Sequence, residues 1–406
     1  MNWERRRTVI LNNFCVLPFN SVSISATGNL RQCCNGGEKP YNVFVQDSTV
    51  DEIINNKKAQ ALRSSFLKNE KDPACSRCLN IEAIGNRSFR HVANEDASHG
   101  LKSVIPIKMD TTIEFENIQY LDITLGNKCN LACRMCNATS SSLLAKQLKE
   151  FKLYSGDEFI DFSRESKDKI LELIDRSKNL NSIYMLGGEP LINDFHDEIV
   201  ELLVKQNRAK DIKIHYSTNI QIDIEKYLPM WKEFKYIDLN ISIDGSHETY
   251  EYIRWPGKWD KVFKNLKRAC EFRKEANFYP VIATTTQNLN ANNLFDLISE
   301  CSTLNHTYVP FFFIPVTGGN FLELTPTHIL ETEIKKLQTL PDPYGRVKEL
   351  IQHYHEASKK SETITKAQVT DFFETQKRFD LYRKQNLFVT HPHFVEMAEK
   401  FNIETW

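Results

Sequence analysis

The stretch IQYLDITLGNKCNLACRMC, residues 118–136, decides the fold and the chemistry predicted for this chain. Its first half, IQYLDITL at 118–125, is typical of a strand. Its second half places Cys129, Cys133 and Cys136 in the loop that follows. Thiolates suit zinc or an iron–sulfur cluster. A structural zinc site normally has four protein ligands, so three cysteines leave one metal position open, as catalytic sites do.

Five more strand-like stretches follow, each separated from the next by a loop and, in most cases, a helix-like stretch such as DEIVELLVKQ or WDKVFKNLKRACEF. Alternation of this kind predicts an α/β fold with a parallel sheet and right-handed crossovers. Six units make three-quarters of an eight-stranded barrel, in which the loops after the strands gather at one mouth. The predicted strands are 118–125, 181–186, 212–218, 236–243, 280–286 and 308–316.

The pattern divides the chain into a partial (β/α)6 TIM-like barrel at 117–320 and two flanking segments. Residues 1–95 are rich in cysteine and predict a small α+β module, joined to the barrel by a polar linker at 96–116. Residues 321–406 are charged and predict a helical segment without a motif of its own, with helices near 326–340, 344–360 and 365–384.

The cysteine-rich module contains one predicted hairpin and one predicted helix. SVSISATGNLRQCC alternates around Thr27 and Gly28, as a hairpin does. TVDEIINNKKAQALRSSFLKNE, residues 49–70, carries apolar residues at helical spacing, and we expect one helix there.

Composition excludes several classes of partner. The formal net charge of the 406 residues is -1, so no global basic field draws the chain to nucleic acid or to an anionic membrane. No window approaches the ~18 continuous apolar residues of a membrane span, and the start of the chain has no secretory signal pattern. We therefore expect a cytoplasmic protein, in which the ten cysteines serve metal or redox chemistry before disulfides.

The stretch CNLACRMC at 129–136 resembles the cluster-binding loop of the radical S-adenosylmethionine (SAM) enzymes. In that family three cysteines hold a [4Fe–4S] cluster, and SAM chelates the fourth iron through its amino and carboxylate groups. The reduced cluster cleaves SAM to a 5′-deoxyadenosyl radical, which abstracts hydrogen from the substrate. The resemblance implies that Cys129, Cys133 and Cys136 bind the cluster and that Met135, a position often aromatic in the family, contacts SAM. A partial zinc knuckle is the alternative from spacing alone.

The second predicted strand ends in MLGGEP, residues 185–190. Glycines let a backbone approach a ligand closely, and a glutamate can accept hydrogen bonds from an ammonium group. A plain strand-to-helix turn is the alternative. The stretch resembles the GGE loop of radical SAM enzymes, which binds the SAM amino group, and this implies SAM contacts from Gly187, Gly188, Glu189 and Pro190.

Polar residues also end the third and fourth predicted strands. The sequences are STN at 217–219 and SIDG at 242–245, followed by YIRWPGKWDKV. Short polar side chains there suit ribose or carboxylate groups, and an arginine suits a carboxylate. These loops resemble the loops that contact SAM in the radical SAM family, and the resemblance implies SAM contacts from Ser217, Asn219, Ser242, Asp244 and Arg254.

The cysteines before the barrel suggest a second, closed site. Cys15, Cys33, Cys75 and Cys78 can supply four thiolates to zinc or to an iron–sulfur cluster. The segment resembles the SPASM and shorter twitch modules, which hold auxiliary [4Fe–4S] clusters in radical SAM enzymes, although such modules usually follow the barrel. The resemblance implies one auxiliary cluster on these four cysteines, with Cys34 as the alternative to Cys33.

The resemblance implies an enzyme with two [4Fe–4S] clusters and SAM, reduced by a partner such as flavodoxin or ferredoxin. We expect it to abstract hydrogen from a C–H bond of a peptide or protein. The same radical chemistry on a small metabolite, such as an amino sugar or a nucleoside-like compound, is the first alternative. A non-catalytic protein with two metal sites is the second.

Overall fold

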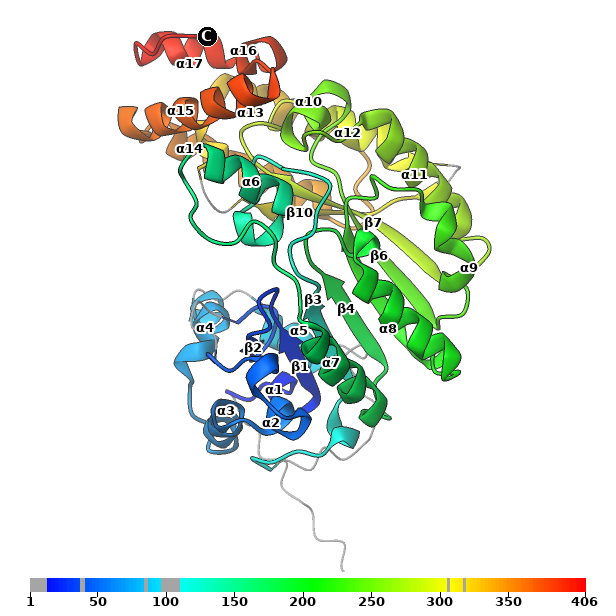
Figure 1. Ribbon diagram of the computed structural model, residues 1–406. Helices are drawn as coiled ribbons and strands as arrows, with labels where there is room; N and C mark the ends of the chain where they lie inside the picture. The colour runs from blue at the N-terminus through cyan, green and yellow to red at the C-terminus, as the bar shows by residue number, and fades with distance from the viewer. Residues whose placement is uncertain (1–12, 37–40, 84–86, 96–109, 305–306, 317–318) are drawn as a thin grey trace, which may run out of the picture. The chain divides into compact units, whose positions relative to one another are not determined.

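The computed structural model describes residues 13–36, 41–83, 87–95, 110–304, 307–316 and 319–406 (Figure 1). Most of the predicted linker, residues 96–109, lies outside the described residues. The chain divides into two compact units that alternate along the sequence. Unit 1 comprises residues 1–126, 161–186 and 195–214, and unit 2 comprises residues 127–160, 187–194 and 215–406.

The strands of unit 1 join the N-terminal segment to the start of the barrel. β1 (Ser21–Ile24) and β2 (Leu30–Arg31) form the predicted antiparallel hairpin, with Gly28 at a φ of 77° in its turn. β1 also pairs in parallel with β3 (Tyr120–Thr124), which pairs in parallel with β4 (Ser182–Leu186). The hairpin therefore extends the barrel sheet, a pairing that no local sequence pattern indicates.

The helices of unit 1 show one difference from prediction. The single helix expected over residues 49–70 is two helices, α2 (Val50–Asn55) and α3 (Lys57–Leu67). Asn56 separates them in an extended conformation, and its side chain accepts hydrogen bonds from the first amides of α3, as a helix N-cap does. The other helices are α1 (Leu17–Asn20), α4 (Ser76–Ala83), α5 (Phe89–Glu95), α7 (Arg164–Arg176) and most of α8 (Asp194–Lys205).

Unit 2 holds the later strands and the helices that follow them. β6 (Tyr236–Ser242) and β10 (Phe311–Pro315) each pair in parallel with β7 (Phe278–Thr286). β5 (Lys213–Thr218) crosses the boundary between the units at Ile214. Figure 1 shows α11 (Trp259–Phe272) beside β6 and β7. The further elements are α6 (Ser142–Glu150), α9 (Leu228–Trp231), α10 (His247–Ile253), α12 (Leu294–Cys301), β8 (Thr303–Leu304) and β9 (Thr307–Tyr308).

The sheet has eight strands in the order β2-β1-β3-β4-β5-β6-β7-β10. From β3 to β10 the strands follow one another in chain order, as expected for a partial (β/α)6 barrel. Each of these six strands lies within three residues of its predicted bounds. The predicted α/β fold with a partial TIM-like barrel and a helical C-terminal segment is therefore confirmed.

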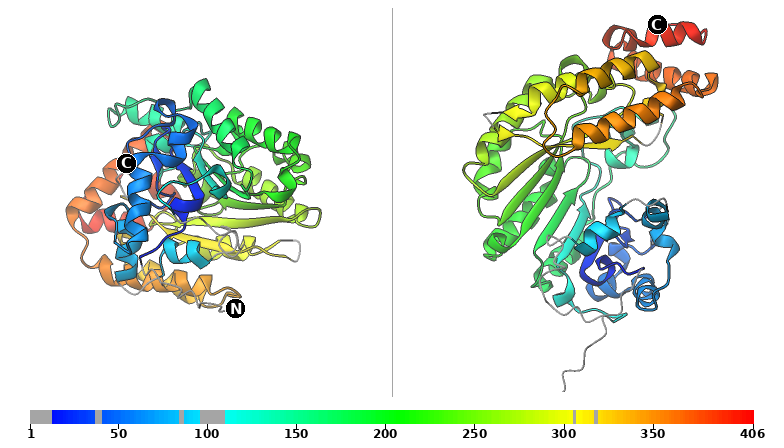
Figure 2. Two further views of the ribbon diagram at one scale, coloured as in Figure 1. Left: turned by 90° about the horizontal axis from the view of Figure 1, so that it is seen from below. Right: turned by 180° about the vertical axis from the view of Figure 1, so that it is seen from behind.

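The C-terminal segment is helical, as predicted, and packs around an apolar core. Figure 2 shows α13 and α14 side by side. Val369, Phe372 and Phe373 form part of a buried cluster with Phe394. Among the helices of the described residues, none has the length and apolar character needed to cross a membrane. The segment contains α13 (Thr327–Leu337), α14 (Arg346–Ser361), α15 (Lys366–Arg383), α16 (Leu387–Thr390) and α17 (Phe394–Lys400).

Candidate functional site

The three-cysteine loop is held in unit 2 by the backbone that follows α10. The amide of Ala132 donates to the carbonyl of Trp255 at 2.7 Å, and the amide of Arg134 donates to the carbonyl of Ile253 at 2.9 Å. These two amides flank Cys133, which is buried. The bonds therefore fix the middle cysteine of the loop against the barrel.

The three thiols lie close enough to influence one another. Burial, and after it the charge of Cys133, raises the pKa of Cys136 to about 12. The same two causes raise the pKa of Cys129, and burial raises that of Cys133. Cys133 is buried and Cys129 and Cys136 are half-buried, so the three thiols disfavour their thiolate forms until a cation joins them. Their chemistry fits a group that brings several positive metal centres to the loop.

The described residues contain no group of three or more metal-ligating side chains arranged around a single ion. The thiolates of an iron–sulfur cluster bind different irons, so they lie farther apart than the ligands of one ion.

The predicted GGEP loop packs directly on the backbone that precedes Cys129. A Cβ atom on Gly188 would lie 2.3 Å from the carbonyl oxygen of Lys128 and 2.6 Å from that of Asn127. The amide of Glu189 donates to the same Lys128 carbonyl at 2.8 Å. Only glycine allows this approach, so Gly188 determines how closely the two loops meet. Gly187 lies between the end of β4 and Gly188, and Pro190 begins a short 3-10 helix.

Glu189 links the ends of β4 and β5. Its carboxylate accepts hydrogen bonds from the Thr218 hydroxyl at 2.7 Å, the Asn219 amide at 2.6 Å and the Leu191 amide at 3.1 Å. Burial raises the pKa of Glu189 to about 7 despite these bonds. A carboxylate has about four acceptor positions, so about one remains for a ligand. The sequence pointed to the STN stretch but not to this role of Thr218.

Asn219 holds the first part of the cysteine loop. Its Nδ2 donates to Oδ1 of Asn130 at 2.9 Å and lies 3.9 Å from Sγ of Cys129. Ser217 and Ser242, the other polar residues predicted at these strand ends, are half-buried on β5 and β6. Asn219 is therefore tied to the cysteine loop, whereas contacts of all three residues with SAM stay a prediction.

Asp244 and Arg254 form a buried ion pair beside Cys133. Nε of Arg254 lies 2.7 Å from Oδ2 of Asp244, although the contact is too bent for a hydrogen bond. Oδ1 of Asp244 accepts from the amide of Thr285 at 2.7 Å. Nη1 of Arg254 contacts Sγ of Cys133 at 3.6 Å. In this structure the arginine predicted to bind the SAM carboxylate thus has a partner in its own chain and touches a predicted cluster ligand.

Met135 contacts apolar residues of unit 2. It is half-buried and packs against the apolar cluster that includes Tyr252, Leu324 and Phe372. The side chain thus contacts the C-terminal segment, and its predicted contact with SAM stays a prediction.

The four predicted auxiliary ligands come together in unit 1. Cys15, Cys33, Cys75 and Cys78 line one small pocket with Arg90. Burial raises the pKa of Cys15 to about 12, and the charges of Cys75 and Cys78 add to the rise while Arg90 opposes it. Four converging thiols with a nearby guanidinium fit a closed, thiolate-bound cluster.

The charged groups around Cys34 differ from those around Cys33. After burial, the charge of Asp122 on β3 is the largest cause that raises the pKa of Cys34. Burial and the charges of Cys15, Cys75 and Cys78 raise the pKa of Cys33. The structure therefore groups Cys33, and not Cys34, with the other three cysteines, as the sequence favoured. Ligation itself stays a prediction.

The C-terminal segment contributes residues that sequence reasoning missed. Arg134, inside the three-cysteine loop, forms a fully buried ion pair with Asp380 of α15 at 2.6 Å. Its Nη1 donates to Gln376 at 2.6 Å, and its Nε donates to the carbonyl of Tyr252 at 2.9 Å. No spacing or motif in the sequence signals this contact, because the partners are about 240 residues apart.

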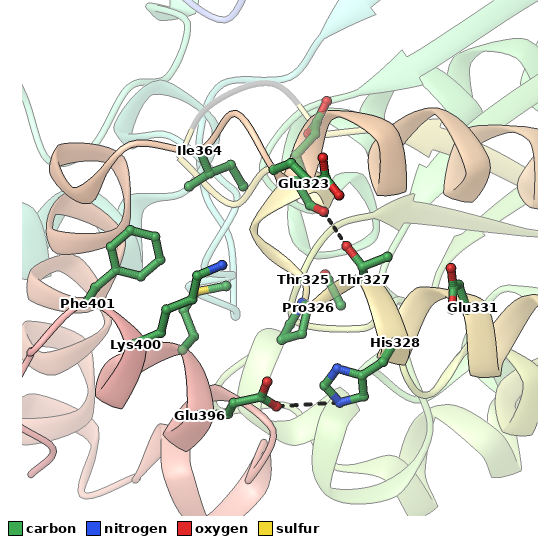
Figure 3. Close-up of a pocket in the computed structure, with 13 residues that line it drawn as sticks. Glu323, Thr325, Pro326, Thr327, His328, Glu331, Ile364, Glu396, Lys400 and Phe401 are labelled. Carbon is green, nitrogen blue, oxygen red and sulfur yellow. Dashed lines mark hydrogen bonds and ion pairs between the residues drawn. The ribbon is translucent and has the colours of Figure 1, made fainter.

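A separate pocket lies in the C-terminal segment and contains none of the predicted site residues (Figure 3). Pro326, Ile364 and Phe401 supply apolar lining, and His328 and Glu396 form an ion pair at 3.5 Å across it. Its lining does not reach the cysteine loop.

Two sequence families match the chain. Residues 123–289 match the radical SAM superfamily, and residues 15–79 match an iron–sulfur cluster-binding domain of the SPASM family. The first range contains the three-cysteine loop, and the second contains the four upstream cysteines. The predicted cofactors, iron–sulfur clusters and SAM, are confirmed at the level of these domains.

Characterised relatives are distant. A GTP 3′,8-cyclase of Clostridium perfringens is 26% identical over 232 residues, which cover 55% of this chain and 65% of the relative. The radical SAM cyclopropyl synthase TigE of Paramaledivibacter caminithermalis is 25% identical over 169 residues, 40% of this chain and 34% of the relative. The chain thus spans less than two thirds of the length of either relative.

Solved structures give weak matches as well. The structure titled anSMEcpe with bound AdoMet aligns with a TM-score of 0.38 and 20% identity, covering 55% of this chain and 58% of that chain. Streptococcus suis SuiB bound to S-adenosylmethionine aligns with a TM-score of 0.37 and 15% identity, covering 73% and 62%. The two family matches carry the conclusion: the chain contains a radical SAM superfamily domain, preceded by an iron–sulfur cluster-binding domain.

Proposed function

We propose that this chain is a radical SAM enzyme that abstracts hydrogen from a C–H bond of a peptide or protein. The observation that carries the proposal is the meeting of the three-cysteine loop with the GGEP loop at Gly188. A loop that supplies three thiolates leaves one iron open, and the adjacent loop supplies a carboxylate with an acceptor position to spare. With SAM bound, the reduced cluster supplies a 5′-deoxyadenosyl radical.

The residues of this chain bind and orient the reactants. Cys129, Cys133 and Cys136 hold the cluster. Glu189 accepts a hydrogen bond from the SAM ammonium group, which favours the ionised carboxylate. Arg254 is oriented by Asp244 and contacts Cys133, and we assign it to the SAM carboxylate because a guanidinium suits a carboxylate.

We assign the remaining predicted SAM contacts to Met135, Ser217, Asn219 and Ser242. The four upstream cysteines hold the auxiliary cluster. A flavodoxin or ferredoxin supplies the electron, and the cytoplasm, where such donors and free thiols occur, is the expected location.

Anaerobic reconstitution tests the central claim. We expect reduced protein with SAM to release 5′-deoxyadenosine and methionine and to hold about eight irons per chain, as two four-iron clusters require. Alanine at Cys129, Cys133 and Cys136 together should abolish cleavage. The matched control is Cys270→Ala, which removes a buried thiol of α11. Cleavage by the triple variant would refute the proposal and favour a metal-binding protein without catalysis.

The proposal of a peptide or protein substrate follows from the resemblance of the upstream segment to SPASM and twitch modules, and residues 15–79 match the SPASM iron–sulfur cluster-binding domain. A small nucleotide-like metabolite is the second candidate, and the similarity to GTP 3′,8-cyclases favours it. Deuterium transfer into 5′-deoxyadenosine separates the two. The radical should take deuterium from a labelled peptide under the first proposal, and from labelled GTP or a related nucleotide under the second.

A further inference from the structure

Arg383, at the end of α15, is a buried cation that forms no ion pair with a carboxylate of the described residues. Only 6% of the residue is exposed. Its Nη2 donates to the carbonyl of Ala132 at 2.7 Å and to Gln147 at 2.9 Å. In the described part of the chain, no carboxylate forms an ion pair with it, and its Nη1 is buried without a hydrogen-bond partner.

The positive charges of the two other arginines at the cysteine loop are each balanced by a carboxylate. Arg134 pairs with Asp380 and Arg254 pairs with Asp244. Asp380 also accepts hydrogen bonds from the Leu387 amide at 2.6 Å and from Trp406 at 3.0 Å, so both of its carboxylate oxygens already have partners. An isolated buried charge is costly to a fold. The position of Arg383 is therefore unfavourable unless a negative group stands near it.

The geometry locates that negative group. Ala132, whose carbonyl accepts from Arg383, directly precedes Cys133. Burial and then the charge of Arg134 lower the pKa of Arg383 to about 9, whereas the charges of Cys133, Tyr252 and Asp380 act in the opposite direction. The guanidinium also lies 4.2 and 5.3 Å from the centroids of the Phe379 and Trp255 rings, within cation–π distance of both. Asp380 is already paired with Arg134, and the bond to Ala132 holds Arg383 next to Cys133, so an anionic group bound by Cys133 would complete the compensation of Arg383.

We propose that Arg383 is the charge-compensating residue of the cluster held by Cys129, Cys133 and Cys136, with Nη1 donating to a cluster or cysteine sulfur. This rests on the proposed function, because it requires the cluster in this loop. A cluster with three thiolates is net negative, and a buried cation and a hydrogen bond to its sulfur both favour the reduced state. Arg383 therefore raises the reduction potential of this cluster and is a positioning residue, since it touches the cysteine loop from outside.

The test compares R383M with wild type in the full chain, with and without clusters. The matched control is R378M, which removes an exposed arginine of the same helix, at a position five residues before Arg383. In redox titrations followed by electron paramagnetic resonance, we read the cluster whose signal changes when SAM is added. We compare the two proteins at the potential where half of the wild-type cluster is reduced. There we expect the ratio of reduced to oxidised cluster to be about tenfold lower in R383M, which corresponds to a reduction potential lower by about 59 mV for one electron. R378M should match wild type.

A second readout separates charge compensation from packing. Without clusters, R383M should unfold at the same or a higher urea concentration than wild type, because an uncompensated charge has been removed. With clusters, R383M should lose iron faster. Equal destabilisation of both forms, with an unchanged potential, would overturn the inference. If R383M cannot be purified, R383Q provides the same comparison. Failure of wild type to cleave SAM would instead count against the proposed function.

Discussion

At the scale of single residues, Gly188 has the closest backbone neighbours among the glycines of the described residues. A methyl group there meets two backbone carbonyl oxygens, at 2.3 and 2.6 Å, that cannot move without shifting the cysteine loop. We predict that Gly188→Ala lowers the free energy of unfolding by about 1–3 kcal/mol, the usual range for overpacking, and reduces the iron bound by the loop. Urea unfolding and iron analysis measure both effects. Gly319→Ala is the control, since its Cβ meets only Asp371 at 4.0 Å; equal behaviour of the two variants would contradict the prediction.

Glu189 is a second single residue with a testable effect, because its titration makes the stability of the fold depend on pH. Burial raises its pKa from the ordinary 4.5 to about 7, so the folded chain without SAM holds a proton that the unfolded chain has released. The titration of Glu189 therefore lowers the free energy of unfolding as pH rises from about 4.5 to 7. The slope is at most about 1.4 kcal/mol per pH unit.

We predict that Glu189→Gln removes this part of the pH dependence in urea unfolding curves. Glu248→Gln, at an exposed position of α10, is the control and should leave the wild-type profile intact. A wild-type slope in the Glu189→Gln variant would show that Glu189 does not titrate in this window.

At the scale of elements, α15 holds the cysteine loop through the buried ion pair of Arg134 with Asp380. Asp380→Asn leaves the charge of Arg134 buried without compensation. Breaking one side of a buried ion pair costs about 3–5 kcal/mol, and we predict a loss of that size in chemical unfolding, together with faster loss of iron from the SAM cluster. Glu374→Gln, exposed on the same helix, is the matched control. Wild-type unfolding of Asp380→Asn would mean that the contact does not support the loop.

At the scale of the whole molecule, the two cysteine sets belong to different compact units. The four upstream cysteines lie in unit 1, and the three-cysteine loop and every predicted SAM contact lie in unit 2. We predict that Cys33→Ala with Cys75→Ala removes about four irons but leaves SAM cleavage to 5′-deoxyadenosine in place. Cys34→Ala is the control and should keep both clusters. Loss of SAM cleavage in the double variant, with the remaining cluster intact, would contradict this independence.

Much of the fold and of the candidate site followed from sequence because their signals are local. Strands and the loops after them repeat along the chain, and the rules for parallel sheets place the ends of β3 to β6 at one edge. Glu189 and Asn219 therefore came together near Cys129 as expected. Asn56 is the exception, since a single capping residue divided a helix that the apolar pattern joined.

The sequence by itself determined the architecture and the two cysteine sets, because periodicity and cysteine spacing are properties of neighbouring residues. The cofactor class followed from the resemblance of its motifs to those of radical SAM enzymes. Only the tertiary structure decided that Cys33 and not Cys34 joins the other upstream cysteines, that β1 extends the barrel sheet, and that Arg134 and Arg383 connect the cysteine loop to α15. The contacts of β1 with β3 and of the cysteine loop with α15 join residues about 100 to 250 positions apart. Their partners are chosen by burial and charge compensation in the folded chain, and no local pattern encodes them.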